Sequence, residues 1–273
     1  MLVYNTVMKR KGGGRERILS RVAVVTGASS GIGRATALAL AREGARLSLA
    51  SRDAQMLRKV ACEIEKLGRE ALAVPTDVSD PAQVKVLVDE TLSRWGRVEI
   101  LIANAGTYTR KPVAEMSAAD VEQAMSLNFY TALHPILAVL PHMIAQRRGH
   151  IVLVSSMDGK KGLPLDAPYV AAKFALAGLA DVMRQELRAC GVHVTGVFPG
   201  RVDTPMIANL RFSWISPKIP PEAVASAIVR AVRKRQSEVI LPLQARGLLY
   251  VSMVSPALGD WIVRAFHLEG WER

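Results

Sequence analysis

The sequence has little cysteine, and this scarcity excludes two classes of protein. Only Cys62 and Cys190 occur among 273 residues, and they form no CxxC pair. Such a chain has neither a disulfide framework nor a cysteine zinc site, and separated thiols suit a reducing compartment. We therefore expect a cytoplasmic protein whose stability comes from its hydrophobic core, because a chain of this length can bury roughly 75% of its unfolded surface.

Metal-ligand and hydrolase patterns are also missing. None of the five histidines stands at a ligand spacing from Cys, Asp or Glu, so we expect no metal site. Ser156 has no GxSxG sequence around it. This disfavours a Ser–His–Asp hydrolase, whose nucleophile needs that sharp turn.

Long apolar runs are absent as well. No charge-free apolar run of eighteen residues appears, so a plain transmembrane helix is not expected. The N-terminus is unlike a secretory signal, because its short apolar start precedes its basic cluster instead of following it. Residues 1–20, with three glycines at positions 12–14, are expected to form a flexible basic tail outside the fold.

Acidic residues are fewer than basic ones, with 24 Asp and Glu against 36 Lys and Arg, a net charge of +12. Such an excess favours a nucleic-acid or membrane-surface partner. However, residues 1–21 carry +5 of it and residues 201–273 carry +4, so the central part is nearly ordinary. No helix-turn-helix, zinc-finger or RNA-binding motif is recognisable, and we expect no nucleic-acid partner.

Seven short apolar runs alternate with longer helical patterns from residue 21 onward. Continuous apolar strands joined by helices are typical of a parallel sheet covered on both faces. We expect one α/β domain over residues 21–241, a Rossmann-type doubly wound sheet of about seven strands. The expected strands are Val22–Thr26, Arg46–Ala50, Ala71–Pro75, Glu99–Ala103, His150–Ser155, Val192–Val197 and Glu238–Leu241. The helices between them include Ile32–Glu43, Ala54–Leu67, Ala82–Trp95 and Ala167–Ala189.

The first expected strand runs into a glycine-rich turn, Gly27-x-x-x-Gly31-x-Gly33. Glycines there let the backbone turn sharply and approach a pyrophosphate at a helix N-terminus, although tight turns alone also use glycine. The second strand ends at Ser51 and Arg52, near the place where a carboxylate would bind a ribose 2′-hydroxyl. A hydroxyl and a guanidinium suit a 2′-phosphate instead. The pattern therefore predicts NADP(H) in preference to NAD(H).

Two charged residues near this turn have simpler interpretations. Asp53 follows Arg52 and is expected to cap the next helix or to serve as its first-turn acid. Arg34 either adds positive charge beside the turn or faces solvent.

A tyrosine and a lysine lie four residues apart in the fifth strand–helix unit. Tyr169 and Lys173 are expected on one helix face, where an exposed neighbour pair would look the same. Ser156 lies thirteen residues upstream of Tyr169, just past the strand His150–Ser155. Open parallel sheets carry their sites at such strand ends, so the three residues together indicate a catalytic site.

With these residues, the chain resembles the classical short-chain dehydrogenase/reductase family over about residues 21–241. The motifs that carry the resemblance are Thr26-Gly27-x-x-x-Gly31-x-Gly33, Asp77, Asn104-Ala105-Gly106, Asn128, Ser156, Tyr169-x-x-x-Lys173 and Pro199-Gly200. Two small departures are Ala103, where asparagine is usual, and Glu99, where aspartate is common. Neither removes a catalytic group.

The resemblance implies a catalytic role for four residues. Tyr169 would be the general acid in carbonyl reduction and the base in the reverse direction, with its pKa of about 10 lowered by the Lys173 ammonium. Lys173 would also bind the nicotinamide ribose, and Ser156 would hydrogen-bond the carbonyl oxygen. Asn128 would hold a water that links Lys173 to solvent. A mid-helix asparagine often faces water, but its apolar neighbours predict a buried, partnered amide.

The resemblance also implies a set of cofactor-binding residues. Asp77 would contact adenine, or would merely cap a helix. Asn104 would support the cofactor and the adjacent strands, and Val202 and Thr204 would meet the carboxamide and phosphates. The whole implied set is Gly27, Ser29, Ser30, Gly31, Ile32, Gly33, Ser51, Arg52, Asp77, Val78, Asn104, Ala105, Gly106, Tyr169, Lys173, Pro199, Gly200, Val202 and Thr204.

Residues 205–215, which in this family form a mobile lid over the substrate, are apolar and aromatic here. An apolar lid indicates a lipophilic ketone or alcohol, such as a sterol, retinoid, long-chain acyl or sphingoid ketone, unless these side chains only pack the hinge. The expected pocket residues are Ser156, Tyr108, Met206, Leu210, Phe212 and Trp214.

Residues 242–273 extend beyond the last expected strand. We expect two short amphipathic helices broken at Ser255-Pro256, because Pro256, Asp260 and Arg264 argue against a membrane span. Three roles remain open for them: they could lie on a membrane surface, cover the pocket or contact a neighbouring subunit.

The sequence thus predicts an NADP(H)-dependent oxidoreductase that reduces a ketone or aldehyde, or oxidises the matching secondary alcohol. We expect a small lipophilic substrate and a homodimer or homotetramer. The alternative is a non-catalytic NADP(H)-binding sensor on the same fold. The intact set of Asn128, Ser156, Tyr169 and Lys173 argues against that alternative.

Overall fold

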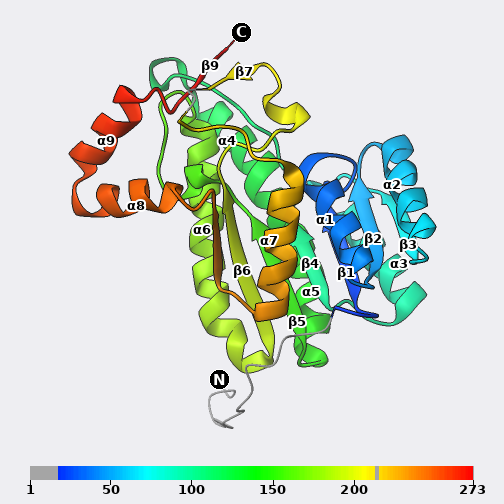
Figure 1. The fold of residues 1–273 in the computed structure, drawn as a ribbon. Helices are drawn as coiled ribbons and strands as arrows, with labels where there is room; N and C mark the ends of the chain where they lie inside the picture. Colours follow the sequence, from blue (N-terminus) through cyan, green and yellow to red (C-terminus); the bar gives the residue numbers. More distant parts are fainter. Residues whose placement is uncertain (1–17, 213–214, 273) are drawn as a thin grey trace.

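A seven-stranded parallel sheet organises the molecule, whose computed structural model describes residues 18–212 and 215–272 (Figure 1). The strand order is β3-β2-β1-β4-β5-β6-β8, so the chain starts in the middle and winds outward in both directions. The strands are β1 (Val22–Thr26), β2 (Arg46–Ser51), β3 (Ala71–Pro75), β4 (Ile100–Ala103), β5 (Gly149–Val154), β6 (Val192–Pro199) and β8 (Glu238–Leu241). The predicted doubly wound α/β fold is confirmed.

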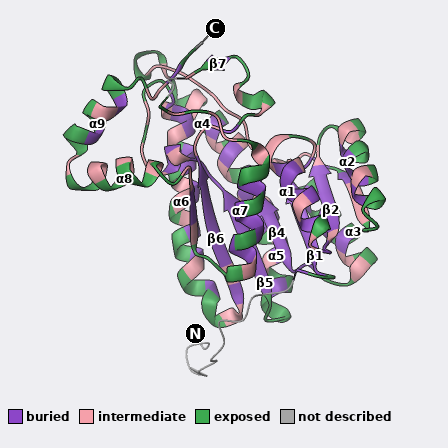
Figure 2. Cartoon of the chain, viewed as in Figure 1, coloured by how far each residue is buried: buried purple, intermediate pink, exposed green. Residues whose placement is uncertain are grey.

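Helices cover both faces of the sheet, and the hydrophobic core divides into two layers accordingly. One layer contains residues of α1 (Gly31–Arg42), α2 (Ala54–Lys66) and α7 (Pro221–Lys234). The other contains residues of α3 (Pro81–Trp95), α5 (Thr131–Ala145) and α6 (Ala167–Glu186). The strands between the layers are buried, as Figure 2 shows, which explains their uninterrupted apolar sequences.

Polar contacts fix the edges of these layers. Asp53 caps α2 by accepting a hydrogen bond from the Met56 N–H at 2.9 Å, as predicted. Arg34 bonds Glu63 of α2 at 2.6 Å, so it joins two helices instead of adding a free charge to the glycine turn. Glu99 is buried and accepts from the Val22 N–H at 3.2 Å, which ties the start of β4 to β1.

One long helical segment passes a simple test for a membrane span. Residues 118–145, made of α4 (Ala118–Met125), the π-helical turn η2 (Ser126–Tyr130) and α5, contain a window of mean hydropathy 1.2. In the structure this segment is a core helix, because Ile136, Val139 and Met143 pack in the layer that covers β4 and β5. That packing explains the apolar residues on the inner side of the segment, while 39% of the apolar window is buried and the rest of it lies toward the surface.

The C-terminal extension forms α8 (Ala245–Val254) and α9 (Pro256–Ala265), with the break at Ser255-Pro256 where it was predicted. After α9 the chain returns to pair β9 (Trp271–Glu272) antiparallel with β7 (Leu210–Arg211). The extension projects beside the carboxyl ends of β5 and β6 (Figure 1). Most of the expected basic tail, residues 1–17, lies outside the described residues, whereas Ile18 is buried in the core.

Candidate active site

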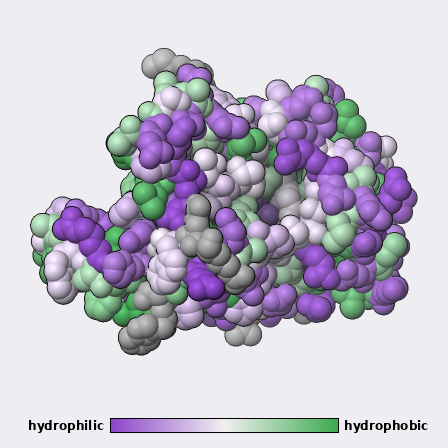
Figure 3. Space-filling model, turned by 90° about the horizontal axis from the view of Figure 1, so that it is seen from above, coloured by the Kyte–Doolittle hydropathy of each residue, from purple (hydrophilic) through white to green (hydrophobic). Residues whose placement is uncertain are grey.

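The carboxyl ends of the central strands open into a cavity of about 730 Å³. It lies where the strand order reverses between β1 and β4, the usual place for a ligand in an open parallel sheet. Figure 3 looks down on this end, where the surface is hollowed between the two halves of the molecule. All residues of the expected cofactor set except Gly33 line this cavity.

The glycine turn between β1 and α1 is held against the end of β4. Gly27 and Gly31 have φ values of +64° and +50°, which favour glycine. The Thr26 hydroxyl accepts hydrogen bonds from the Asn104 and Ala105 N–H groups at 3.0 and 3.1 Å. Gly33 faces the turn itself, because a Cβ there would lie 2.1 Å from the Gly27 carbonyl oxygen. The role of Gly33 is therefore to let α1 pack closely against the glycine turn.

The end of β2 presents hydroxyl and guanidinium groups to the cavity. Ser51 donates a hydrogen bond to the Ser29 hydroxyl at 2.9 Å, which joins β2 to the glycine turn. Arg52 is exposed on the rim of the same cavity. Asp77 accepts from the Ser79 hydroxyl at 2.6 Å, and this contact, with a smaller effect of Arg52, lowers the pKa of its carboxyl. The sequence left open whether Asp77 caps the next helix. In the structure Asp80 is the cap, because its carboxylate accepts a hydrogen bond from the Ala82 N–H at the start of α3.

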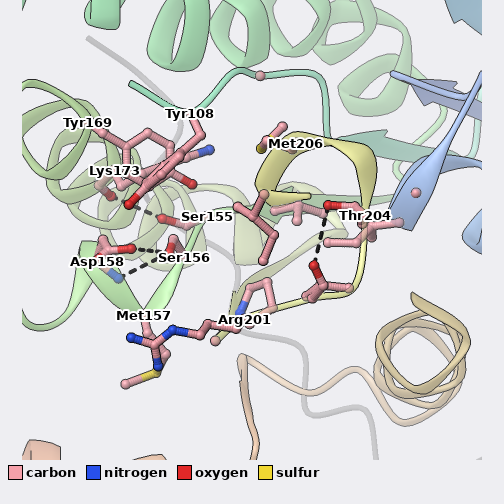
Figure 4. Close-up of a pocket in the computed structure, with 18 of the residues that line it drawn as sticks. Tyr108, Ser155, Ser156, Met157, Asp158, Tyr169, Lys173, Arg201, Thr204 and Met206 are labelled. Carbon is pink, nitrogen blue, oxygen red and sulfur yellow. Dashed lines mark hydrogen bonds between the residues drawn. The ribbon is translucent and has the colours of Figure 1, made fainter. Parts of the chain in front are cut away.

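The structure brings Ser156, Tyr169 and Lys173 together (Figure 4). Ser156 follows β5 and begins the short 3-10 turn η3 (Met157–Gly159), while the other two share one face of α6. Tyr169 and Lys173 are only 7% and 4% exposed, and the Lys173 Nζ lies 5.3 Å from the centre of the Tyr169 ring. The ring of Tyr108 packs edge-on against Tyr169 at 5.1 Å. The two residues are therefore not an exposed neighbour pair.

Asn128 lies in the π-helical turn η2 and is 1% exposed. Its Nδ2 donates to the Ala124 carbonyl and its Oδ1 accepts from the Thr107 N–H, both at 3.1 Å. The amide is thus buried and partnered, as its apolar neighbours predicted. A Cβ on Gly106 would lie 2.8 Å from Asn128 Oδ1 and 3.6 Å from Lys173 Nζ, so the glycine lets both side chains approach this point.

Burial controls the ionisation of the site. It raises the pKa of the Tyr169 phenol above its usual value, the charge of Asp158 adds to the rise, and the Ser156 hydroxyl offsets part of it. Burial also lowers the pKa of Lys173 to about 8. The structure does not give the lowered phenol pKa expected from the lysine, because burial disfavours the phenolate more than the neighbouring groups stabilise it.

Sequence reasoning missed five charged residues that line the cavity: Asp158, Lys161, Asp166, Arg201 and Glu269. Asp158 Oδ2 accepts from the Ser156 hydroxyl at 2.9 Å, and burial raises the pKa of this carboxyl. Asp166 accepts from the Tyr108 hydroxyl at 2.7 Å, and burial raises its pKa to about 7. The two aspartates could have been predicted from their position between Ser156 and Tyr169 in the sequence. Arg201 could have been predicted because it directly follows Pro199-Gly200. No sequence motif indicated that Glu269 would line the cavity.

The outer part of the cavity is lined by residues 205–217 and by the extension. Of the expected pocket residues, Tyr108, Ser156, Met206 and Phe212 line the cavity, but Leu210 does not, because it is buried in β7 where that strand pairs with β9. Trp214 lies outside the described residues. The extension contributes Leu248, Ile262, Phe266 and Leu268 to the lining. Part of residues 242–273 therefore covers the pocket.

Comparison with known proteins agrees with this geometry. Residues 21–213 match the profile of the short chain dehydrogenase family. The ketoacyl reductase HetN of Nostoc sp. is 33% identical over 260 residues, which cover 91% of this chain and 90% of that protein. A short chain dehydrogenase/reductase of Burkholderia phymatum, solved in complex with NAD, is 26% identical with a TM-score of 0.81, covering 89% of this chain and 96% of that one.

A second solved structure carries the other nicotinamide cofactor. The alcohol dehydrogenase of Thermococcus sibiricus, complexed with 5-hydroxy-NADP, is 28% identical with a TM-score of 0.73, covering 81% of this chain and 96% of that one. Both neighbours hold a nicotinamide dinucleotide in this fold. The chain therefore belongs to the short-chain dehydrogenase/reductase family and is an oxidoreductase that acts on the CH–OH/C=O pair.

Proposed function

We propose that this enzyme uses NADP(H) to reduce a lipophilic ketone or aldehyde, or to oxidise the matching secondary alcohol, with Tyr169 as the general acid or base. The observation that carries the proposal is geometric: Tyr169 and Lys173 share one buried face of α6, Ser156 follows β5, and all three line the cavity. A protonated acid beside the carbonyl oxygen is what reduction needs.

Each of the four catalytic residues has its own role in the reaction. Ser156 turns its hydroxyl proton from Asp158 to the carbonyl oxygen, which polarises the C=O bond and stabilises the developing alkoxide. Tyr169 gives its proton to that oxygen, and the Lys173 ammonium stabilises the phenolate that remains. The nicotinamide supplies the hydride when it is bound. Asn128 holds a water that returns a proton toward Lys173.

The residues at the end of β2 fit a cofactor with a 2′-phosphate. Asp53, the first carboxylate after the strand, is occupied by the Met56 N–H as a helix cap. Arg52 has no ion-pair partner among residues 18–212 and 215–272, and it lies on the cavity rim beside Ser51. Its charge also acts on Asp77, but without a direct ion pair the guanidinium keeps its donors for a phosphate, which it would bind through two parallel hydrogen bonds. This supports NADP(H) in preference to NAD(H).

The lining of the outer cavity supports a lipophilic substrate. Met206 and Phe212 of the lid face Ile262 and Phe266 of the extension around the same space. Apolar walls of this kind bind apolar ligands and leave orientation to a few polar groups. The name of the relative HetN, a ketoacyl reductase, supports a substrate with an acyl chain.

A ketone panel tests the proposal. Cofactor oxidation is followed with ketones of increasing chain length, once with NADPH and once with NADH. We expect kcat/KM to rise with chain length and to be higher with NADPH. An efficiency with NADH at or above that with NADPH overturns the cofactor preference. Absence of turnover with every ketone favours the alternative, a cofactor-binding sensor.

We also propose that the enzyme acts in the cytoplasm as a homodimer or homotetramer. We further propose that it touches a membrane through its C-terminal extension. The outer apolar side chains of the extension are strongly exposed, with Met253 at 81% and Val254 at 88%. Arg246 and Arg264 lie on the same two helices and suit anionic headgroups. Flotation with anionic liposomes tests this: Met253→Glu combined with Val254→Glu should abolish co-flotation, and equal flotation of variant and wild type rejects membrane contact.

A further inference from the structure

The cavity lining contains buried polar atoms that the proposed reaction does not use. Within the described part of the chain, Thr107 Oγ1, Asp158 Oδ1, Arg201 Nε and Glu269 Oε2 have no hydrogen-bond partner, and all four residues line the cavity. A buried polar atom without a partner is costly. The carboxyl oxygens of Asp158 and Glu269 are acceptors, so each of them lacks a donor.

Asp158 is the acceptor best placed to contact a substrate. It is 9% exposed, and its Oδ2 accepts from the Ser156 hydroxyl while its own N–H donates to that hydroxyl oxygen at 3.1 Å. These two bonds fix the carboxylate directly beside the group that would hold the carbonyl oxygen (Figure 4). Oδ1 belongs to the same carboxyl group and is therefore also held close to Ser156.

Neighbouring cations act on Asp158 only through longer-range charge interactions, from Arg201 and Lys173, and not through a direct bond. The Arg201 guanidinium instead bonds the Ser216 hydroxyl and stacks on the Phe212 ring at 4.2 Å. No ion pair joins Asp158 to any cation among residues 18–212 and 215–272. Asp166 differs, because it has both the Tyr108 hydroxyl and Arg110, whose Nε lies 3.5 Å away. Asp158 Oδ1 is thus a buried carboxyl oxygen without a partner, and a cation bound beside it would favour the ionised form of this group.

We propose that the preferred substrate carries a hydrogen-bond donor, an ammonium or a hydroxyl, on the carbon next to its carbonyl group, and that Asp158 selects this donor. The inference rests on the proposed reductase function and specifies its substrate. A carbonyl held by Ser156 brings the adjacent substituent toward Asp158 Oδ1, while an apolar tail extends toward Ile262 and Phe266. A site built to bond such a donor discriminates strongly against the analogue that lacks it.

Three long-chain ketones of equal length test the proposal: an α-amino ketone, an α-hydroxy ketone and the unsubstituted ketone. For each protein we take the ratio of kcat/KM for a substituted ketone to that for the unsubstituted one. In the wild type we expect at least one ratio to be about tenfold or more. Because a general disturbance of Ser156 affects all three ketones, the ratio isolates the contact with the substituent.

Two variants and a control complete the experiment. Asp158→Ala should bring both ratios close to one. Asp158→Asn should lower the amino ratio far more than the hydroxy ratio if the donor is an ammonium, and both modestly if it is a hydroxyl. Asp181→Asn, on the outer face of α6 where Asp181 pairs with Arg184, should leave the ratios unchanged. Thermal melting and NADPH fluorescence confirm that each variant is folded.

Two results overturn the inference. One is a wild type that reduces the unsubstituted ketone as efficiently as both substituted ones, and the other is a high ratio that survives in both Asp158 variants. Either result leaves the reductase function standing. Absence of turnover with all three ketones would instead refute the proposed function itself.

Discussion

At the scale of single residues, burial determines which proton each group of the site carries. Tyr169 and Asp158 have raised pKa values, and that of Lys173 falls to about 8, so each shifts toward its neutral form. The protonated phenol suits reduction directly. Oxidation of an alcohol needs the phenolate, which the same burial disfavours. Reduction leaves the same phenolate behind, so the raised pKa favours neither direction, and the Lys173 ammonium has to stabilise that anion in both.

Arg52 carries the predicted preference for NADPH. Arg52→Ala should lower kcat/KM for NADPH about tenfold or more and change that for NADH little, because only the 2′-phosphate loses a charged partner. Steady-state kinetics with both cofactors measure the effect. Arg58→Ala, on the exposed side of α2, is the matched control and should change neither value. A proportional loss with both cofactors would show that Arg52 does not read the phosphate.

Gly33 and Gly178 form a matched pair for the glycine turn. A Cβ at Gly33 would collide with the Gly27 carbonyl oxygen, whereas one at Gly178 in α6 meets nothing within 4 Å. Gly33→Ala should therefore lower the free energy of unfolding by on the order of 3 kcal/mol. Gly178→Ala should raise it by up to about 1 kcal/mol, because alanine favours a helix. Urea unfolding measures both, and equal effects would contradict the packing described for the turn.

At the scale of elements, sequence patterns within one segment predicted the secondary structure of that segment. The strands between residues 22 and 241, the Asp53 cap and the break at Ser255-Pro256 follow from periodicity and capping chemistry, and the structure has them. Contacts between distant segments had no such signal. Glu269 reaches the cavity only because β9 pairs with β7, and that pairing also buries Leu210.

The start of α6 contains a group whose ionisation should control stability. The pKa of Asp166 in the folded protein is about 7, above its ordinary value of 3.8, because burial disfavours the charge. Between these pH values the folded protein keeps a proton that the unfolded chain has released, so the stability due to Asp166 falls as the pH rises through this window.

Asp166→Asn should remove this pH dependence while keeping an acceptor for the Tyr108 hydroxyl. Relative to the wild type, the variant should be more stable at pH 8 than at pH 4.5, by on the order of a few kcal/mol. Urea midpoints at the two pH values measure the difference. Any constant cost of leaving Arg110 without its carboxylate cancels in this comparison. The same stability difference at both pH values would contradict the raised pKa.

At the scale of the whole molecule, exposed apolar side chains of the described residues gather on two pairs of helices. One group lies on the far side of α8 and α9, and the other is formed by exposed residues of α5 and α6. The second set is Leu137, Ile144, Phe174 and Val182. Exposed apolar surface on neighbouring helices of one layer is typical of a subunit contact, so it supports the proposed homo-oligomer.

Leu137→Glu combined with Phe174→Glu should convert the oligomer to a monomer, because two charges would be buried against an apolar partner surface. Size-exclusion chromatography with light scattering measures the mass. Leu67→Glu, an exposed apolar position at the end of α2 on the opposite layer, should leave the mass unchanged. A wild type that is monomeric at micromolar concentration would reject this contact.

The central claim is that the buried phenol of Tyr169 transfers the proton in ketone reduction. The most direct measurement compares the wild type with Tyr169→Phe, following NADPH oxidation by a long-chain ketone and NADPH binding by fluorescence. Removal of one hydroxyl should lower kcat by at least about 10²-fold while cofactor binding stays measurable. Near-normal turnover by a Tyr169→Phe protein that binds NADPH would contradict the account.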